Sequence, residues 1–365
     1  MISADDARFM RLALGLGRRG LGRTSPNPPV GAVVVANGRV VGRGYHHRAG
    51  LPHGEIEALR DAGARARGAT LYVTLEPCAH HGRTPPCTKA IIAAGIRRVV
   101  FGSRDPNPKV TGNGMGKLRA AGIEVRDGVE AAECDALNAA FCKHVITGLP
   151  LVTLKLAASL DGCIATASGE SRWITNATSR RYVHRLRAEH DAILVGAATV
   201  MRDDPELTCR VRSGRNPTRI IVDGRLRIPL SAKVLETRTA PTLVVTSNAA
   251  SQRKIAKLRG LGVDVLSCAA NGGVVPLKSL MRRLGRRGVL SVLIEGGATV
   301  AASALRAGVV DRLLIFYAPK LIGGDGRPML GSLGVREMQR AWKTGALHVK
   351  RFAGDLLVAT EVMTE

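Results

Sequence analysis

Hydrophobic and polar positions switch repeatedly between helical and strand periods along the chain. Ser3 and Asp6 have the form of a helix cap, so a first helix is predicted to run to about Arg19. Two apolar runs joined by Asn37-Gly38 predict a β-hairpin. In all, strands are predicted at 30–35, 39–45, 70–75, 98–101 and 123–125, and further helices at 54–66, 88–94, 115–121 and 130–145. This alternation is typical of a three-layer α/β/α domain.

The pattern restarts after Thr147-Gly148-Leu149-Pro150, so we place a boundary there and expect domains 1–148 and 149–365. In the second domain, strands are predicted at 151–156, 192–195, 219–222, 242–245, 263–266 and 289–294, with helices at 179–190, 251–261 and 277–284. Late strands at 312–317 and 355–362 predict an antiparallel edge and therefore a mixed sheet. The polar segment 195–208 and the glycine-rich segment 112–116 are predicted to be loops.

Composition limits the class of protein. The chain has 365 residues, of which 45% are apolar and 23% charged, which is enough apolar material for two buried cores. Its longest apolar run is far shorter than the roughly 18 residues of a membrane span. Because the first residues are polar and acidic, we expect a cytoplasmic protein without a secretory signal. Seven cysteines, an odd number, do not indicate a disulfide framework.

The net charge of +25 requires an explanation. Part of this charge can reflect a codon-biased genome that tolerates Arg on protein surfaces, and a basic surface can also attract phosphorylated small molecules or nucleic acid. Base stacking by single-stranded nucleic acid needs aromatic side chains, and the chain has only two Trp, four Tyr and five Phe. We therefore expect an anionic small-molecule substrate and no nucleic-acid or membrane partner.

A candidate metal site begins at His53-Gly54-Glu55 and continues at Cys78 and Cys87. One imidazole and two thiolates form a three-ligand zinc set whose fourth position is open to water. Both cysteines lie near predicted helix starts, where the helix dipole favours a thiolate. Glu55 is placed to take a proton from that water and return it to a leaving amine. This is the arrangement of zinc deaminases that attack an amino-pyrimidine carbon.

The alternative is that these residues are unrelated core positions. Their joint occurrence in this order argues against it. The spacing is unusual, because base deaminases place two residues between the cysteines, whereas eight residues separate Cys78 from Cys87.

That spacing belongs to a longer pattern, formed by Pro26-Asn27-Pro28-Pro29-Val30-Gly31, Gly44-Tyr45-His46, Pro52-His53-Gly54-Glu55 and Pro77-Cys78-Ala79-His80-His81-Gly82-Arg83-Thr84-Pro85-Pro86-Cys87. It resembles the deaminase half of the bifunctional riboflavin-biosynthesis deaminase–reductases, in which Ala is more common at the position of Gly54. The resemblance implies a cytidine-deaminase-like fold, with zinc held by His53, Cys78 and Cys87 and Glu55 as the catalytic proton shuttle. It also implies a substrate pocket formed by Asn27, His46, His80 and Arg83.

The second half resembles the reductase half of the same family, at residues 154–162, 168–175, 195–208 and 294–299. The family pattern often has Gln or Lys at the position of Arg172. The resemblance implies a dihydrofolate-reductase-like fold that uses NADPH, with cofactor contacts from Ala157, Trp173, Thr199, Asp203, Gly297, Ala298, Thr299, Val300, Ala301, Ala302 and Ser303. It implies substrate contacts from Ser171, Arg187, Leu207, Arg210 and Glu295. Lys155 is a candidate catalytic residue that would polarise the reacting sugar carbon.

The resemblance implies two consecutive reactions on a 5′-phosphorylated pyrimidine of riboflavin synthesis, a zinc-dependent deamination and an NADPH-dependent reduction of ribosyl to ribityl. We expect a homo-oligomer. Two other hypotheses remain open at this point. One is a nucleic-acid-editing deaminase, which leaves the second domain without a role. The other is a structural zinc module fused to a non-catalytic, reductase-like domain.

Overall fold

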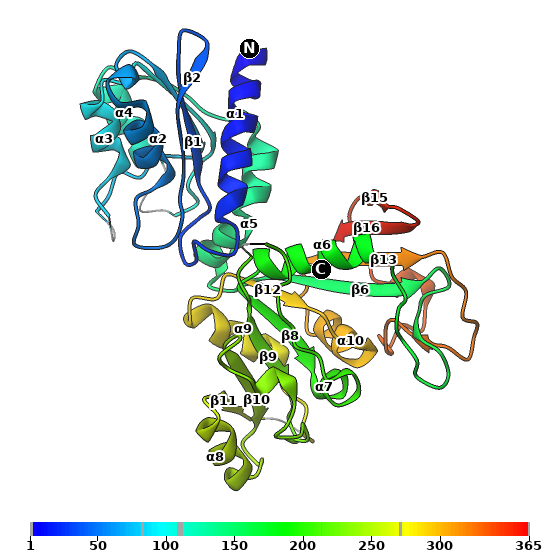
Figure 1. Ribbon diagram of the computed structural model, residues 1–365. Helices are drawn as coiled ribbons and strands as arrows, with labels where there is room; N and C mark the ends of the chain where they lie inside the picture. The colour runs from blue at the N-terminus through cyan, green and yellow to red at the C-terminus, as the bar shows by residue number, and fades with distance from the viewer. Residues whose placement is uncertain (1–2, 82–83, 108–111, 213, 270–271, 364–365) are drawn as a thin grey trace. The chain divides into compact units, whose positions relative to one another are not determined.

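The computed structural model describes residues 3–81, 84–107, 112–212, 214–269 and 272–363 (Figure 1). The chain divides into two compact units, Met1–Leu149 and Pro150–Glu365. Each unit contains a β-sheet and hydrophobic clusters of its own. None of the helices in the described ranges combines the length and the apolar character that a membrane span requires.

The first unit is built on a five-stranded sheet with the strand order β2-β1-β3-β4-β5. Its strands are β1 (Gly31–Ala36), β2 (Arg39–Tyr45), β3 (Thr70–Leu75), β4 (Arg98–Ser103) and β5 (Glu124–Arg126). β1 is antiparallel to β2 and β3, whereas β3, β4 and β5 run parallel. The predicted hairpin is confirmed: Asn37 and Gly38 both have positive φ, 49° and 71°, as a tight turn between twisted strands requires.

Helices cover both faces of this sheet, which gives the predicted three layers (Figure 1). The helices are α1 (Ala4–Gly17), α2 (Gly54–Ala62), α3 (Cys87–Ala93), α4 (Asn113–Ala120) and α5 (Ala131–Thr147), with 3₁₀ turns at Arg18–Gly20 and Gly63–Ala66. Alternate residues of the strands face opposite layers. Val33 and Tyr72 pack with α1 and α5, whereas Val34, Leu71 and Phe101 pack with α2, α3 and α4.

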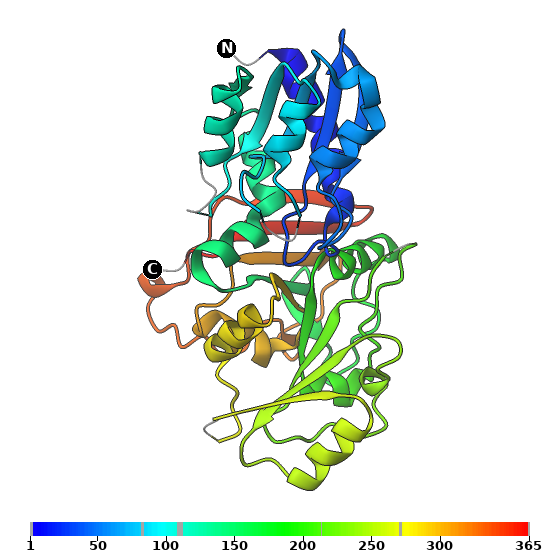
Figure 2. The same ribbon diagram turned by 90° about the vertical axis from the view of Figure 1, so that its left-hand side faces the viewer.

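The second unit is built on a nine-stranded mixed sheet with the order β11-β10-β9-β8-β12-β6-β13-β16-β15. Its strands are β6 (Leu151–Ser159), β8 (Ala192–Gly196), β9 (Thr218–Val222), β10 (Thr242–Ser247), β11 (Asp264–Cys268), β12 (Ser291–Ile294), β13 (Arg312–Ala318), β15 (His348–Phe352) and β16 (Asp355–Glu361). The seven strands from β11 to β13 are parallel, and β16 and β15 form an antiparallel edge (Figure 2). The predicted mixed sheet is confirmed.

The helices of the second unit are α6 (Ala177–Glu189), α7 (Ala197–Asp203), α8 (Gln252–Gly260), α9 (Leu277–Arg286) and α10 (Ala298–Arg306), with 3₁₀ turns at Lys233–Leu235 and Met338–Arg340. Val183 of α6 packs on Phe316 and Leu357 of the mixed edge. Two short strands, β7 (Cys163–Ala165) and β14 (Arg327–Pro328), pair outside the main sheet.

Several local predictions were wrong. Residues 197–203 form helix α7 and are not a loop, and Asn113–Gly116 form the first turn of α4. Short elements of this kind depend on tertiary contacts more than on propensity. Strands β7, β14 and β15 were not predicted, because their sequences lack a sustained alternation.

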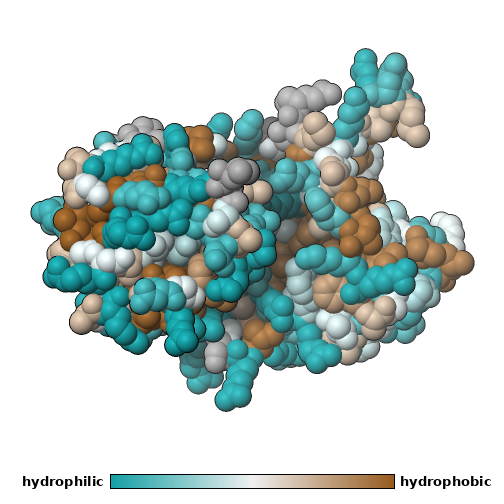
Figure 3. All heavy atoms as spheres, turned by 90° about the horizontal axis from the view of Figure 1, so that it is seen from above, coloured by the Kyte–Doolittle hydropathy of each residue, from teal (hydrophilic) through white to brown (hydrophobic). Residues whose placement is uncertain are grey.

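On the face of the molecule in Figure 3, hydrophilic residues predominate and apolar ones form scattered patches.

Candidate active sites

Three elements of the first unit bring one histidine and two cysteines together. His53 caps α2, Cys78 follows β3, and Cys87 begins α3. Nδ1 of His53 lies 3.2 Å from Sγ of Cys87 and 3.7 Å from Sγ of Cys78. Zinc at its usual bond lengths separates a tetrahedral nitrogen and sulfur by about 3.5 Å. Ligand atoms of all three residues lie within 4.8 Å of one another, so the cluster can hold a single zinc ion.

Hydrogen bonds around the cluster orient its members. Oγ1 of Thr84 lies 3.2 Å from Nε2 of His53, on the side of the ring away from the sulfurs. A proton on Nε2 leaves Nδ1 free as a metal ligand. The backbone N–H of Cys87 donates to Sγ of Cys78 at 3.4 Å, and this bond links the two segments that carry the sulfurs.

The pKa values of the two thiols are shifted in opposite directions. The hydrogen bond with Cys87 lowers the pKa of Cys78 to about 4, and the same bond, together with burial, raises the pKa of Cys87. Burial alone would lower the pKa of His53, but its contacts with Cys78 and Glu55 raise it overall. A thiolate is therefore present at neutral pH, which is the form that binds zinc.

Glu55 is the second residue of α2, and its side chain is only 3% exposed. Its Oε2 is buried and has no hydrogen-bond partner among the described residues. Burial raises the pKa of Glu55, so its carboxyl group is easier to protonate than an exposed one. An unpaired buried carboxylate oxygen close to a three-ligand zinc set is what a proton-transfer role requires.

A cavity of about 280 Å³ opens beside this cluster and is lined by His53, Glu55 and Cys78. Two predicted substrate residues, Asn27 and His80, also line it. The buried His46 lies next to Asn27, with its Nε2 3.1 Å from Nδ2 of that residue. Its Nδ1 lies 2.9 Å from the carbonyl oxygen of Pro52.

Arg83, the fourth residue predicted for this pocket, lies outside the described residues. Residues that the sequence analysis missed also line the cavity, namely Glu76, Thr84, Asp105, Asn107 and Phe141. Asp105 and Asn107 follow β4, the parallel neighbour of β3. The carboxyl ends of adjacent parallel strands meet at one edge of a sheet. The polar residues that follow 98–103 therefore could have indicated that this segment lines the same site as the residues after β3.

In the second unit, predicted cofactor residues gather at the carboxyl ends of three adjacent parallel strands, β8, β12 and β6. Ala157 lies near the end of β6, and Thr199 lies in α7 directly after β8. Gly297 follows β12, and a Cβ added to it would lie 3.9 Å from Oγ1 of Thr199. Within the following residues, Ala298, Thr299, Val300 and Ser303 are at least partly exposed, whereas Ala301 and Ala302 are buried.

A charged cluster lies at the same edge. The guanidinium of Arg187 donates to both carboxylate oxygens of Glu295, at 2.8 and 2.9 Å, and to the carbonyl of Thr208 at 3.1 Å. Burial would raise the pKa of Glu295, but Arg187 lowers it overall. Lys155 lies in β6, where burial lowers its pKa and Glu295 partly opposes that effect. The pair and Lys155 therefore form one electrostatic cluster.

The remaining predicted residues lie in loops around that edge. Trp173 is 62% exposed, its carbonyl accepts from Nζ of Lys320 at 2.6 Å, and the guanidinium of Arg180 lies 4.5 Å from its ring. The carbonyl of Asp203 accepts from Arg172 at 2.7 Å. Ser171 is half-buried, Arg210 is exposed and pairs with Glu206, and Leu207 is buried in the core with a positive φ.

Models of two protein families match the chain. The model described as the cytidine and deoxycytidylate deaminase zinc-binding region matches residues 3–103, and the model of the RibD C-terminal domain matches residues 150–358. The fold and the site thus define an enzyme in which a zinc-binding deaminase unit precedes a reductase unit.

Comparison with known proteins gives the particular family. The chain is 46% identical over 359 residues to the riboflavin biosynthesis protein RibD of Aquifex aeolicus, covering 98% of this chain and 99% of that protein. It is 43% identical over 350 residues to RibD of Escherichia coli, covering 92% and 94% of the two chains. The chain belongs to the RibD family, the bifunctional deaminase–reductases of riboflavin biosynthesis.

Solved structures agree with this assignment. A structure of Acinetobacter baumannii RibD has a TM-score of 0.88 and 40% identity, and covers 99% of each chain. A deaminase/reductase structure from Thermotoga maritima has a TM-score of 0.87 and 40% identity, and covers 98% of this chain and 99% of that one. These relatives match both units of the chain. The hypothesis of a nucleic-acid-editing deaminase gives the second unit no role and is therefore dropped.

Proposed function

We propose that the first unit hydrolyses the 2-amino group of 2,5-diamino-6-(5-phosphoribosylamino)pyrimidin-4(3H)-one, and that the second unit reduces the ribosyl group of the deaminated product to ribityl with NADPH. The Thermotoga maritima relative is a diaminohydroxyphosphoribosylaminopyrimidine deaminase and 5-amino-6-(5-phosphoribosylamino)uracil reductase. The high positive charge suits a phosphorylated substrate.

In the deamination, His53, Cys78 and Cys87 would hold zinc, and the donor set and its spacing fit that ion. Held there, zinc would lower the pKa of the attacking water to near neutral. Glu55 takes a proton from the attacking water through its unpaired Oε2 and returns it to the departing amine. A C–O bond forms at C2 of the pyrimidine, the C–N bond breaks, and ammonia leaves.

Substrate would be held in the cavity beside the zinc cluster. The amide of Asn27 presents both a donor and an acceptor to a pyrimidinone edge, and its contact with His46 fixes which way it points. His80 lines the same cavity. We assign Arg83, which follows Cys78 in the motif, to binding the phosphate group of the substrate.

In the reduction, NADPH would lie along the carboxyl ends of β6, β8 and β12, in contact with Ala157, Thr199 and the start of α10. The amino end of α10 follows two glycines and suits a phosphate group. Arg187 and Glu295 position the substrate, and Lys155 polarises the sugar carbon that accepts the hydride. The cofactor supplies the hydride itself.

We further propose that the protein acts in the cytoplasm as a homo-oligomer. Edge strand β15 and the segment that leads into it expose large apolar side chains, including Met338 at 89%, Leu347 at 63% and Val349 at 57%. An exposed apolar edge is commonly covered by a partner. Sedimentation equilibrium of the purified chain tests this proposal, and a monomer at micromolar concentration would contradict it.

The observation that supports the deaminase proposal most directly is the convergence of His53, Cys78 and Cys87 beside the unpaired oxygen of Glu55. Zinc removal with a chelator should abolish ammonia release, whereas oxidation of NADPH with the deaminated intermediate should continue at its original rate. Restoring zinc should restore ammonia release. Loss of both activities, or survival of both, would contradict the assignment of zinc to the first unit alone.

A further inference from the structure

Glu76 occupies a special position between the sheet and the metal cluster. It follows the last residue of β3, its N–H donates to the carbonyl of Ser103 at 2.9 Å, and it precedes Cys78 by two residues. Glu76 is only 3% exposed, and none of the basic side chains in the described part of the chain forms an ion pair with it. A buried carboxylate needs hydrogen-bond donors that replace the water it has lost.

The start of α4 provides these donors. The backbone N–H of Gly112 donates to Oε2 of Glu76, and that of Met115 donates to Oε1, both at 3.2 Å. The first N–H groups of a helix have no partner within the helix, and the helix dipole favours an anion there. Glu76 is therefore the N-terminal anchor of α4, and the segment that bears Cys78 is attached to that helix.

Two further contacts hold this segment against α4. A Cβ on Gly114 would lie 2.1 Å from the carbonyl oxygen of Pro77, so the helix approaches the backbone as closely as glycine alone allows. One turn later, Nζ of Lys117 donates to the carbonyl of Ala79 at 2.7 Å. The residues on both sides of Cys78 are thus fixed to α4.

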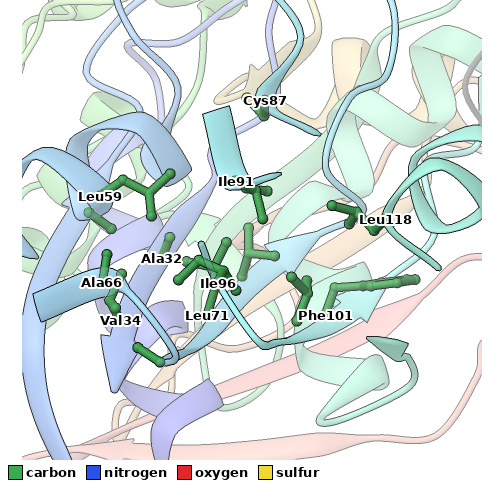
Figure 4. Packing of buried hydrophobic residues seen from close by; sticks show 14 of the residues in the cluster. Ala32, Val34, Leu59, Ala66, Leu71, Cys87, Ile91, Ile96, Phe101 and Leu118 are labelled. Atoms are coloured by element: carbon green, nitrogen blue, oxygen red, sulfur yellow. The ribbon is translucent and has the colours of Figure 1, made fainter. Parts of the chain in front are cut away.

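Helix α3 holds the other side of Cys78. The N–H of Thr88 donates to its carbonyl at 3.2 Å, and the N–H of Cys87 donates to its sulfur. Cys87 begins α3, and Ile91 of α3 and Leu118 of α4 belong to one packed cluster (Figure 4). The core therefore sets the two helices relative to each other, and α4 determines where Cys78 lies relative to Cys87.

We propose that Glu76 is a positioning residue for the zinc site: by anchoring its carboxylate on the amino end of α4, it fixes Sγ of Cys78 at the distance from His53 and Cys87 that zinc requires. This inference rests on the proposed zinc-dependent deaminase function. It assigns no contact between Glu76 and substrate. Groups that orient metal ligands typically change metal affinity about 10–100-fold when they are removed.

The test uses the full-length, zinc-loaded protein and measures transfer of zinc to the chromophoric chelator 4-(2-pyridylazo)resorcinol. Glu76→Ala removes both acceptors and should weaken zinc affinity about 10–100-fold. Glu76→Gln keeps one acceptor at nearly the same size and should give a smaller loss. In cobalt-substituted protein, the visible ligand-field bands should shift in the same order, because they report the geometry of the two sulfur ligands and the imidazole.

Glu133→Gln is the matched control, since Glu133 is an exposed acid in the first turn of α5. It should keep the zinc affinity and cobalt spectrum of the parent chain. Circular dichroism establishes that each variant is folded, and Glu76→Gln carries the test if Glu76→Ala does not fold. Parent-like zinc affinity and cobalt bands in both Glu76 variants would overturn the inference, as would a loss of substrate affinity alone. If the parent chain itself binds no zinc, the proposed function fails as well.

Discussion

The candidate sites of the two units differ in how their polar groups are satisfied. In the first unit, three ligand atoms crowd within 4.8 Å, and a buried oxygen of Glu55 has no partner among the described residues. In the second unit, the charges of Arg187 and Glu295 neutralise each other through two hydrogen bonds. The first arrangement is the one that we propose holds a zinc ion. The second contains a preformed ion pair, and we expect its ligands to bind around that pair.

This difference gives the largest expected effect to Glu55. Glu55→Gln preserves the shape of the side chain but removes the proton acceptor, so ammonia release should fall about 10²–10⁴-fold. NADPH oxidation with the deaminated substrate should be unchanged, because Glu55 lies in the other unit. Zinc content, measured by mass spectrometry of the metal, should also be unchanged.

Glu57→Gln is the matched control. Glu57 lies on the same helix as Glu55, two positions later, and its carboxylate pairs with Arg60 at the surface. Deamination by this variant should match that of the parent chain. If Glu55→Gln deaminates at the parental rate, the zinc site is structural, and the hypothesis of a non-catalytic zinc module would replace the proposed mechanism.

The residues of the His53, Cys78 and Cys87 cluster could be singled out from sequence because each lies in a short motif next to an element boundary. His53 precedes a helix, Cys87 begins one, and Cys78 follows a strand, so local patterns place all three. Phe141 could not be predicted in this way, because it lines the cavity from α5 and no local pattern points to it. Asp105 has a signal only through the order of the parallel strands, since it follows β4, the neighbour of β3.

The same limit applies to the fold. Strand β3 was predicted at its observed bounds, because a run of buried apolar residues specifies it locally. Helix α7 was missed because its seven residues depend on packing, with Ala197 and Val200 in the core of the second unit. The cap on α4 was missed for a related reason: its acceptor, Glu76, comes from 36 residues earlier in the chain.

The second expected effect concerns the ion pair of the second unit. Arg187→Met leaves the carboxylate of Glu295, which is only 10% exposed, without a partner. Loss of one member of a buried pair should lower the free energy of unfolding of this unit by about 3 kcal/mol. Adding Glu295→Gln should recover part of that loss, because the unpaired charge is then removed. Scanning calorimetry measures both variants.

Arg238→Met is the control for that experiment. Arg238 pairs with Glu236 on the surface and is 90% exposed, so its loss should leave the melting temperature unchanged. The double variant should also reduce substrate affinity in the NADPH-oxidation assay. Normal affinity in the double variant would show that the pair stabilises the unit but does not position the substrate.

A second Arg–carboxylate pair, in the first unit, provides the complementary case. Both carboxylate oxygens of Asp6 accept from Arg98, at 2.8 and 3.1 Å, and Oδ1 also accepts from the hydroxyl of Tyr72. Asp6 is only 2% exposed. Neither residue lines the cavity beside the zinc cluster. This pair should therefore affect stability alone.

The hydrogen bond from Arg98, opposed by burial, lowers the pKa of Asp6 from 3.8 to about 2. A carboxyl group whose pKa is lower in the folded state stabilises that state above its unfolded pKa, and the stabilisation is lost as pH falls through the folded value. Asp6→Asn should therefore cost about 2 kcal/mol at pH 7, and the difference from the parent chain should shrink between about pH 4 and pH 2. Melting curves at several pH values measure this, with the exposed neighbour Asp5→Asn as the control.

A cost that does not depend on pH would show that lost packing, not lost charge, destabilises the variant. A change in the rate of deamination would show that this pair affects the site as well as stability.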